Sequence, residues 1–416
     1  MAWFVVRAKT IFHRSFSQKP LRIVSASGTT LTLDDGRTII DATGGPGVAC
    51  IGHNVPEVAE AVTKQLKRIG YLFSGGGFCE DTTEELASHI LEGRPGGLSK
   101  AIFLGSGSEA TEAMLKLVTQ FWAAKGEKRR VNFVARKQSY HGNTLGALCI
   151  TGHEGRRDIY RHWMSENVSF VDACCSYRGK LDDESDEAYL TRLVDQIEAE
   201  FQLLCGMGRT GTLHAWQQED IRGPDLQMIG KSLGGGFIPV SGVLVHQRIF
   251  EAIATPQGAL AGGHTFQAHP TSCAAALAVQ RIIKEQDLLS NVRKQGELLG
   301  RLLQEELGQH PLTGDIRGRG LLWAVEFMRD PATRTPFPMG DDFSHRVVDE
   351  AVENQGVLVL KNLGFPGTWK MDSVVVSPPF IITEEETRES VKRLRRAVDV
   401  VAKGYLDADG KLIHLN

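Results

Sequence analysis

Hydrophobic residues recur along this chain at two spacings, which predict short strands alternating with helices. Short apolar runs bounded by turn residues predict buried strands at 101–104, 131–135 and 226–229. Apolar residues three and four positions apart predict helices over 56–69, 187–201, 270–283 and 287–307. Strands that alternate with helices are typical of an α/β protein with a mostly parallel central sheet.

The alternation stops near residue 300, and the rest of the chain mixes strands and helices. We therefore expect a large α/β domain and a small α+β domain built from both chain ends. The expected boundaries are 1–60 for the N-terminal part of the small domain, 61–305 for the large domain and 306–416 for the C-terminal part of the small domain.

Two local patterns predict turns within the small domain. Residues 28–45 predict a hairpin whose strands meet at Asp34-Asp35-Gly36. Residues 315–327 predict a turn followed by a strand.

Two of the predicted helices have a clear apolar face. In the first, after Pro56, this face consists of Val58, Ala61, Val62, Leu66 and Ile69. In the helix over 187–201 it consists of Leu190, Leu193, Val194, Ile197 and Phe201, while Asp195, Glu198 and Glu200 point outward. Each apolar face is expected to be buried against other elements.

Charge and composition exclude several classes of partner. The 416 residues carry a net charge of -3 at pH 7, so neither nucleic acid nor another charged macromolecule is indicated. The seven cysteines form an odd set without Cys-x-x-Cys spacing, which argues against structural zinc and predicts a reducing compartment. No apolar run reaches the roughly 20 residues that span a bilayer. We expect a soluble protein without a metal site or membrane contact, whose ligands are small molecules.

The first 33 residues are basic and contain no acid, a composition that fits a mitochondrial presequence. However, residues 12–16 and 24–33 already have the pattern of an ordered domain, which leaves only about ten residues for a cleavable signal. We therefore expect a cytoplasmic protein, with the mitochondrion as the alternative.

Lys231 stands between the apolar run 226–229 and three glycines at 234–236. This pattern predicts a strand that leads into a loop, with Lys231 at the rim of the core. Partial desolvation there favours the neutral amine, which attacks a carbonyl to form a Schiff base. The alternative is a lysine that simply ends a strand and points to water.

The segment 101–118 joins a short strand, a Gly-Ser-Gly-Ser turn and a helix. Gly105 and Gly107 allow close approach, and the free N–H groups at a helix start attract anions. A monophosphate has the size that matches this site, and a dinucleotide is not indicated because the Gly-x-Gly-x-x-Gly fingerprint is absent. Ser106 or Ser108 is also a candidate N-cap of the helix, which is compatible with anion binding.

Several aromatic residues are candidates for a binding pocket. Tyr140 follows the strand 131–135, at the edge where open α/β sheets bind ligands, and is placed to stack on a flat ring. An ordinary packed tyrosine is the alternative. For four further aromatics a place in the core is the expected role and a place in the pocket the alternative: Tyr71, Phe73, Phe78 and Trp216.

Five motifs occur along the chain in a fixed order: Gly105-Ser-Gly-Ser-Glu-Ala110, Tyr140-His141-Gly142, Gly206-Met-Gly-Arg-Thr-Gly211, Lys231-Ser-Leu-Gly-Gly-Gly236 and Gly263-His-Thr-Phe-Gln-Ala-His-Pro270. In this order they resemble the pyridoxal-phosphate-dependent aminotransferases of class III, over nearly the whole chain. The resemblance implies fold type I, pyridoxal 5'-phosphate as cofactor and a homodimer with active sites at the subunit interface. It also implies transfer of an amino group between an amino donor and an oxo acid, ketone or aldehyde.

The resemblance assigns individual residues to cofactor and substrate. Lysine suits proton transfer between the carbons of substrate and cofactor, and arginine offers a bidentate fork to a carboxylate. By position in the motifs, the roles are phosphate binding for Gly107 and Ser108, ring stacking for Tyr140, cofactor contact for His141, the Schiff base for Lys231, contact with the neighbouring subunit's phosphate for Thr265 and substrate carboxylate binding for Arg317.

The chain departs from the family pattern near residues 202–205. The family has a strand, a helix and a second strand there, and an aspartate at the end of the second strand pairs with the pyridine nitrogen. That partner keeps the ring protonated and makes it an electron sink. Several dozen residues are missing here, and no acid occurs from Phe201 to Gln218. Loss of two strands is expected to open the middle of the parallel sheet.

Two alternatives to an active aminotransferase follow from these observations. One is a truncated, catalytically impaired relative that lacks the pyridine-nitrogen aspartate and binds cofactor weakly or only pairs with an intact subunit. The other is a decarboxylase, racemase or aminomutase that shares the cofactor motifs.

Overall fold

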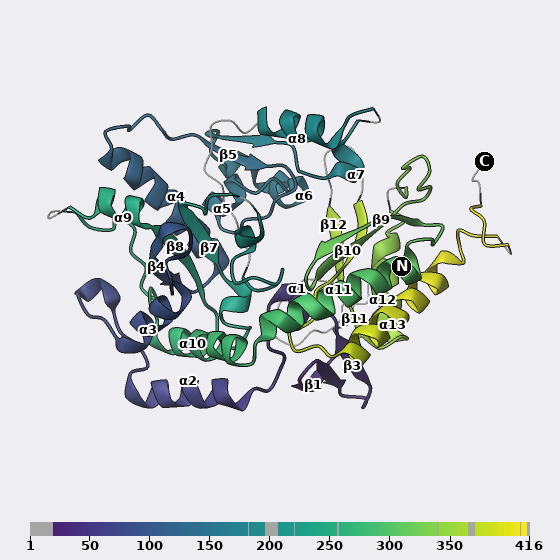
Figure 1. Cartoon of the computed structure of the whole chain (residues 1–416), viewed down its shortest axis with the longest axis horizontal. Coiled ribbons are helices and arrows are strands. Elements are labelled where there is room, and N and C mark those ends of the chain that lie inside the picture. Colours follow the sequence, from purple (N-terminus) through teal and green to yellow (C-terminus); the bar gives the residue numbers. More distant parts are fainter. Residues whose placement is uncertain are drawn as a thin grey trace, which may run out of the picture.

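The protein forms two units that lie side by side, as Figure 1 shows. The first, called the large unit, is built mainly from the middle of the chain, and the second, the small unit, from both ends. The computed structural model describes residues 20–181, 183–195, 207–219, 221–255, 258–338, 340–364, 371–407 and 409–413. The boundaries expected at residues 60 and 305 stay predictions.

The large unit alternates helices and strands along the sequence. Its helices are α2 Pro56–Arg68, α3 Asp81–Ile90, α4 Gly107–Ala124, α5 Leu145–Cys149, α6 Glu154–Arg157, α7 Ser176–Gly179, α8 Asp186–Asp195, α9 Gln247–Ile253 and α10 Pro270–Glu285. Its strands are β4 Leu98–Leu104, β5 Phe133–Arg136, β6 Val168–Val171, β7 Leu226–Ile229 and β8 Ser241–His246. The helices and strands predicted from the apolar spacing are present. The strand 226–229 has the predicted ends, whereas the end predicted at 201 for the helix over 187–201 lies outside the described residues.

The strands β4, β8 and β7 form a three-stranded sheet in that order. The central strand β8 is antiparallel to both neighbours, and Val243 lies opposite Ile102 on one side and Met228 on the other. β8 follows β7 after the short connection 230–240, which is too short to hold a helical crossover, so the chain returns antiparallel. Leu244 faces a core shared with α3 and α10, whereas Val243 faces α4.

The strands β5 and β6 form a separate two-stranded parallel sheet. The α/β class is confirmed. In the part of the chain that the structure describes, the central sheet is divided into these two sheets, as expected from the missing segment, and the larger of the two is antiparallel. The physical reason is the one expected from the missing segment: without two central strands, β7 and β5 have no neighbours to join them.

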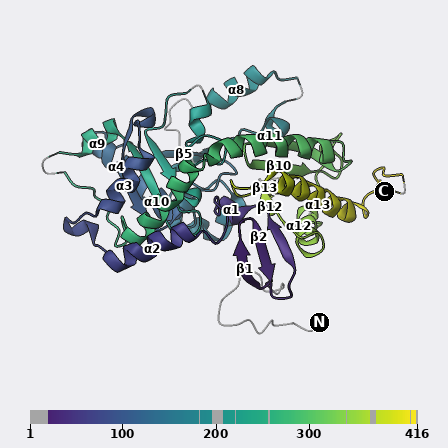
Figure 2. The ribbon, with the colours of Figure 1, turned by 60° about the horizontal axis from the view of Figure 1, so that its bottom comes forward.

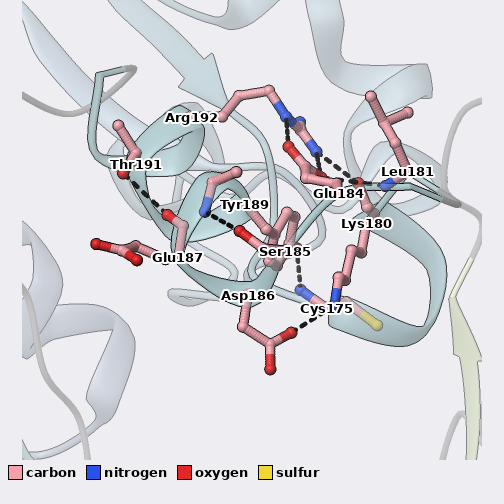
Figure 3. A network of polar contacts seen from close by, with 12 residues as sticks. Cys175, Lys180, Leu181, Glu184, Ser185, Asp186, Glu187, Tyr189, Thr191 and Arg192 are labelled. Carbon is pink, nitrogen blue, oxygen red and sulfur yellow. Dashed lines mark hydrogen bonds and ion pairs between the residues drawn. The ribbon is translucent and has the colours of Figure 1, made fainter.

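Helix α8 is held to the segment before it by a network of polar contacts (Figure 3). The Arg192 guanidinium donates two hydrogen bonds to Glu184, at 2.8 and 2.7 Å, and a third to the Gly179 carbonyl at 2.8 Å. The side-chain hydrogen bonds from Arg192 lower the pKa of Glu184 to about 2. The Tyr189 hydroxyl accepts from the Cys175 backbone N–H at 2.9 Å. These contacts fix the start of α8 through local partners.

The apolar face predicted for this helix is only partly buried. Leu193 is 6% exposed, but Leu190 is 54% exposed, so its expected burial is wrong. The strands that such a face would cover are missing from the sheet, which leaves Leu190 in solvent. The side chains of the remaining predicted positions lie outside the described residues: Val194, Asp195, Ile197, Glu198, Glu200 and Phe201.

The small unit contains two four-stranded sheets and three long helices. Its helices are the short turn α1 Gly44–Gly47, α11 Leu288–Leu307, α12 Phe343–Glu353 and α13 Glu384–Ala402. Its strands are β1 Ile23–Ser27, β2 Thr30–Leu33, β3 Thr38–Asp41, β9 Thr313–Arg319, β10 Leu322–Phe327, β11 Val357–Leu358, β12 Leu360–Gly364 and β13 Met371–Val376.

The two chain ends are joined through backbone pairing in the small unit. The predicted hairpin is formed by β2 and β3, and β3 also pairs in parallel with β11 from the C-terminal part. Figure 2 shows β1 and β2 projecting from this unit next to α12. The second sheet has the order β12-β13-β10-β9. Within 315–327 the predicted turn lies at 320–321 and the strand that follows it is β10. Residues 315–319 before the turn form part of β9 and pair with β10, so the segment is a hairpin and Arg317 lies within β9.

Five further predictions of burial have mixed outcomes. Trp216 is 7% exposed and belongs to the core, as expected. A place in the core is wrong for Tyr71, Phe73 and Phe78, which are 46%, 51% and 63% exposed, and Leu66 in α2 is 56% exposed. None of the helices in the described ranges is long and apolar enough to cross a lipid bilayer.

His214 is a fully buried histidine beside the three-stranded sheet. Its ring stacks on Trp216, with 5.7 Å between ring centroids. The indole N–H of Trp216 donates in turn to Gln227 of β7 at 3.0 Å. Burial lowers the pKa of His214 to about 4.

This buried imidazole is expected to make the protein less stable in mild acid. The unfolded imidazole gains a proton as the pH falls below about 6.5, while the folded form stays neutral down to a pKa of about 4. Between these values the side chain should remove up to about 3 kcal/mol from the free energy of unfolding. Urea denaturation at several pH values should show a smaller acid loss for His214→Phe than for the natural protein. The exposed-site control His162→Gln should keep the full loss, and equal losses in all three proteins would contradict the prediction.

Candidate active site

Lys231 stands directly after β7 and begins a short 3-10 turn, η5 Lys231–Leu233. Its φ of 49° is left-handed, a conformation that is uncommon outside glycine and is concentrated at functional sites. The Lys231 carbonyl accepts hydrogen bonds from Gly234 and Gly235 at 3.3 and 3.1 Å, so the glycine loop folds back onto the lysine. The side chain is exposed, so the expected partial desolvation is wrong.

The start of α4 has the geometry of an anion site. Ser106 is the N-cap, and its hydroxyl accepts from the Glu109 backbone N–H at 3.3 Å. The Gly105 N–H donates to the Glu109 carboxylate at 2.8 Å. A Cβ added at Gly107 would meet no heavy atom within 4 Å, so there is open space over the first turn. The free N–H groups and positive end of the helix dipole face a ligand placed there.

The loop that carries Tyr140 and His141 packs against this helix start. The Thr111 hydroxyl lies 2.6 Å from the His141 carbonyl, and the Asn143 N–H donates to the Ser108 hydroxyl at 2.9 Å. A Cβ at Gly142 would lie only 2.8 Å from the same hydroxyl, so the loop can approach this closely only with glycine. The structure therefore brings Ser108 and His141 together.

The same helix start is joined to the strand that ends at Lys231. The Thr111 hydroxyl lies 3.1 Å from the sulfur of Met228 in β7. The Ser241 hydroxyl in β8 donates to the Ser106 carbonyl at 2.6 Å, and a Cβ at Gly230 would lie 3.6 Å from the Ser241 side chain. The glycine before Lys231 and the start of α4 are thus both in contact with Ser241.

Tyr140 and His141 differ in their surroundings. Tyr140 is 51% exposed, and the Arg156 guanidinium lies 4.7 Å from the centre of its ring. His141 is half-buried, and burial, together with the charge of Arg136, lowers its pKa to about 4. Its imidazole is therefore neutral at neutral pH. The Arg156 guanidinium covers one face of the half-exposed Tyr140 ring, so stacking on a ligand would use the other face.

Thr265 lies on an exposed loop near the start of α4. The neighbouring His264 ring nitrogen is 3.4 Å from the Glu109 carboxylate. The Tyr71 hydroxyl donates to the Thr265 carbonyl at 3.1 Å. The contact of Thr265 with a neighbouring subunit stays a prediction.

Arg317 lies in β9, where it binds carboxylates of its own sheet. Its guanidinium is 2.5 Å from Asp315 and 2.7 Å from Glu326. Glu326 is fully buried and also forms an ion pair with Arg178. Among the described residues, Arg317 therefore belongs to this cluster of charges within its own sheet.

Arg209 is a structural residue of this region to which the sequence reasoning gave no role. It is 8% exposed, and burial lowers its pKa to about 10. Its guanidinium donates to the carbonyls of Gly47, Leu321, Ser377 and Pro378, at 3.3, 3.3 and 2.9 Å for the first three. Arg209 is part of the Gly-Met-Gly-Arg-Thr-Gly motif, but the motif alone does not show that its side chain binds carbonyl groups of the small unit.

The carboxylates at the start of α4 already bind backbone groups. Glu109 accepts from Gly105, and Glu112 accepts from the Gly146 N–H at 2.9 Å. The aspartate that pairs with the pyridine nitrogen belongs to the segment that is missing near 202–205, and residues 196–206 lie outside the described ranges. The described residues thus fit the phosphate, the aldehyde and the ring face of pyridoxal phosphate, but they supply no equivalent of that aspartate.

The protein-family comparison agrees with this geometry. A family model described as aminotransferase class-III matches residues 11–202 and 200–398. The chain belongs to the class III aminotransferases. This family consists of enzymes that transfer amino groups with pyridoxal phosphate, on the α/β architecture of fold type I.

Similar proteins cover nearly the whole chain. An uncharacterized aminotransferase of Schizosaccharomyces pombe is 36% identical, over 93% of this chain and 94% of its own length. An aminotransferase of Gibberella zeae is 35% identical, over 93% of this chain and 85% of its own length. The structure of an omega transaminase from Pseudomonas jessenii in complex with PMP has a TM-score of 0.86 and 26% identity, over 92% of this chain and 93% of that one.

The same comparisons support the conclusion that a segment of the family pattern is absent from this chain. The two matches to the family model meet at residues 200–202. The alignment with the S. pombe relative runs over 436 positions, while 93% of 416 residues is about 387, so about 49 positions have no residue of this chain. The class III pattern is therefore interrupted where the sequence departs from it.

Filling the space over the start of α4 is expected to impair phosphate binding without unfolding the protein. Gly107→Val places a side chain in that space, so the affinity for pyridoxal phosphate should fall at least about tenfold. A fluorescence titration measures the affinity, and the melting temperature without cofactor should stay within a few degrees. Gly404→Val is the matched control, because its Cβ would meet nothing closer than 4.0 Å. Equal affinity for the Gly107 variant and the natural protein would contradict the phosphate role.

Proposed function

We propose that Gly107, Ser108, Tyr140, His141 and Lys231 hold pyridoxal phosphate and serve amino-group transfer in this chain. The observation that carries this proposal is the position of Thr111, whose hydroxyl contacts both the His141 carbonyl and the Met228 sulfur. This one side chain joins the start of α4, the Tyr140 loop and the strand that ends at Lys231. Three segments far apart in sequence thereby form one site.

Each residue of the site has a separate task. The first turn of α4 binds the phosphate through backbone N–H groups, and Tyr140 packs on the ring. The Lys231 amine would hold the aldehyde of the cofactor until the substrate amine displaces it, and the freed amine would then move a proton at the reacting carbon of the substrate. The cofactor supplies the delocalised system that stabilises charge at that carbon.

The substrates are an amino donor and a carbonyl acceptor, which is an oxo acid, a ketone or an aldehyde. The class III family supports this level of description. The carboxylate role predicted for Arg317 would require its release from Asp315 and Glu326, which neutralise its guanidinium, so we do not include Arg317 among the substrate contacts. We place the enzyme in the cytoplasm, on the odd cysteine set without disulfide spacing, with the mitochondrion as the alternative.

A homodimer is part of this proposal. Around Thr265, the loops 71–78 and 264–269 expose four aromatic side chains, a surface that we call the aromatic patch: Tyr71, Phe73, Phe78 and Phe266. Tyr71 and Phe266 lie edge to face at 6.0 Å, so the patch is continuous at its centre. A contiguous exposed apolar surface is typical of a protein interface.

A charge in the aromatic patch is expected to weaken the dimer. Phe266 is 54% exposed, so Phe266→Asp should leave the fold intact while it places a carboxylate in the apolar contact. Light scattering after size exclusion should then show a dissociation constant raised by about tenfold or more. Trp163→Asp, at another exposed aromatic, is the control. A monomeric natural protein, or a variant that dimerises as well as the natural one, would contradict the role of the patch.

A second candidate function is that of a catalytically impaired relative that binds cofactor without turnover. The separation of β7 from β5 and the break in the family match at 200–202 favour it. Without an acidic partner, the pyridine nitrogen loses its proton more easily and the ring withdraws electrons less strongly. This candidate keeps Lys231 as the point of attachment, so the two candidates differ in turnover only.

Reduction of the loaded protein tests both candidates. With saturating pyridoxal phosphate, borohydride should add a permanent pyridoxyl label to Lys231, which peptide mass spectrometry locates. Lys231→Ala should lose this label, whereas Lys284→Ala, at an exposed lysine paired with Glu92, should keep it. Absence of the label on Lys231 would contradict the proposed attachment of the cofactor to this residue.

The amino donor then distinguishes the two candidates. L-alanine should convert the bound cofactor to its amine form, seen as a shift of the absorbance band, and release pyruvate in equal amount. A labelled Lys231 that gives no conversion with L-alanine or with a panel of other amino donors would indicate the impaired relative. Release of carbon dioxide or inversion of the donor in place of pyruvate would indicate a decarboxylase or racemase.

A further inference from the structure

Arg156 is a cation at the edge of the candidate site whose partner is an aromatic ring. Its guanidinium lies 4.7 Å from the centre of the Tyr140 ring, and both side chains are exposed. No carboxylate in the described part of the chain lies within ion-pair distance of Arg156. By contrast, its neighbours Arg157 and Arg161 both pair with Glu154.

The backbone holds Arg156 in this place. Residues 137–141 and 151–153 are joined by hydrogen bonds from Gln138 to Gly152 at 2.9 Å, from Gly152 to Ser139 at 3.3 Å and from His141 to Thr151 at 3.1 Å. Helix α6 begins at the residue after this segment. Its first turn therefore lies against the Tyr140 loop, and Arg156 reaches the ring from there.

The electrostatic state of Arg156 differs from that of Arg317. Two carboxylates, Asp315 and Glu326, already neutralise the Arg317 guanidinium. An anionic substrate would have to displace these carboxylates from Arg317. One of them, Glu326, is fully buried and would be left without its partner. Arg156 can accept a carboxylate without breaking an ion pair, because a ring face leaves the edges of the guanidinium open for bidentate hydrogen bonds.

We propose that Arg156 binds the carboxylate of the oxo-acid substrate and orients it beside Tyr140. The inference rests on the proposed function, because it takes Tyr140 as the residue that packs on the cofactor ring. Stacking on Tyr140 limits the conformations of the long arginine side chain, so less entropy is lost when a carboxylate binds. Arg156 thereby selects acceptors that carry a carboxylate over ketones and aldehydes that do not.

Binding of an unreactive dicarboxylate tests this role without turnover. Isothermal titration of glutarate into the full chain, with and without pyridoxal phosphate, measures the dissociation constant directly. For Arg156→Gln it should rise at least about tenfold, which is the effect of losing one charged bidentate contact. Arg156→Lys, which keeps the charge but not the fork, should lie between the two. Melting temperatures of these variants should match that of the natural protein, because Arg156 is exposed.

Two matched variants make the outcome decisive. Arg161→Gln removes a charge from the same segment, where Arg161 pairs with Glu154 and Asp158, and should change glutarate binding less than twofold. Arg317→Gln should also leave it unchanged. Equal losses at Arg156 and Arg161 would show a general charge effect and overturn the proposal. A loss at Arg317 alone, or no glutarate binding by the natural protein, would overturn it as well.

Failure of this inference can be told apart from failure of the proposed function. Absence of a borohydride-stable label on Lys231 refutes cofactor attachment, whatever glutarate does. Labelled Lys231 together with glutarate binding that is insensitive to Arg156→Gln refutes the role of Arg156 alone. In kinetic terms, Arg156→Gln should raise KM for pyruvate while KM for a carboxylate-free aldehyde such as butanal stays the same.

Discussion

The arrangement of the two units depends on the buried guanidinium of Arg209. It donates to the backbone carbonyls of Gly47, Leu321, Ser377 and Pro378, which come from both chain ends. A buried charge is tolerated only when it is hydrogen-bonded, and removal of the guanidinium would leave these carbonyls without their donor. Arg209 thus fixes the loop that follows the missing segment to the small unit, although the strands that precede this loop in the family are absent.

The missing segment changes the large unit in a way that packing explains. A parallel sheet is stable when every strand has neighbours and both faces are covered. Here β7 and β5 belong to separate sheets, and Leu190 on α8 faces solvent. Helix α8 is held instead by polar contacts such as the hydrogen bonds from Arg192 to Glu184. They fix the helix locally, but they do not rebuild the sheet.

The elements, and the positions of the candidate site residues on them, could be predicted from the sequence, but the surroundings of single side chains could not. The glycine-bounded strand before Lys231 and the helix start at Gly107 carry local signals, so their positions were predictable. The pairing of residues 315–319 with β10 was not, because glycines made a paired strand resemble a turn. Arg317 was assigned a substrate from its motif, and only the fold shows the two carboxylates beside it. Arg156 belongs to no motif, and its position depends on how residues 151–153 pack on the Tyr140 loop.

The candidate site keeps its geometry because its contacts do not pass through the missing strands. Thr111 in α4 reaches the His141 carbonyl on one side and Met228 of β7 on the other. Ser241 in β8 binds the Ser106 carbonyl at the start of the same helix. Every one of these segments lies before residue 196 or after residue 206. The deletion therefore separates two properties that the family combines: binding of the phosphate and aldehyde, which these contacts support, and protonation of the ring, which depended on the absent aspartate.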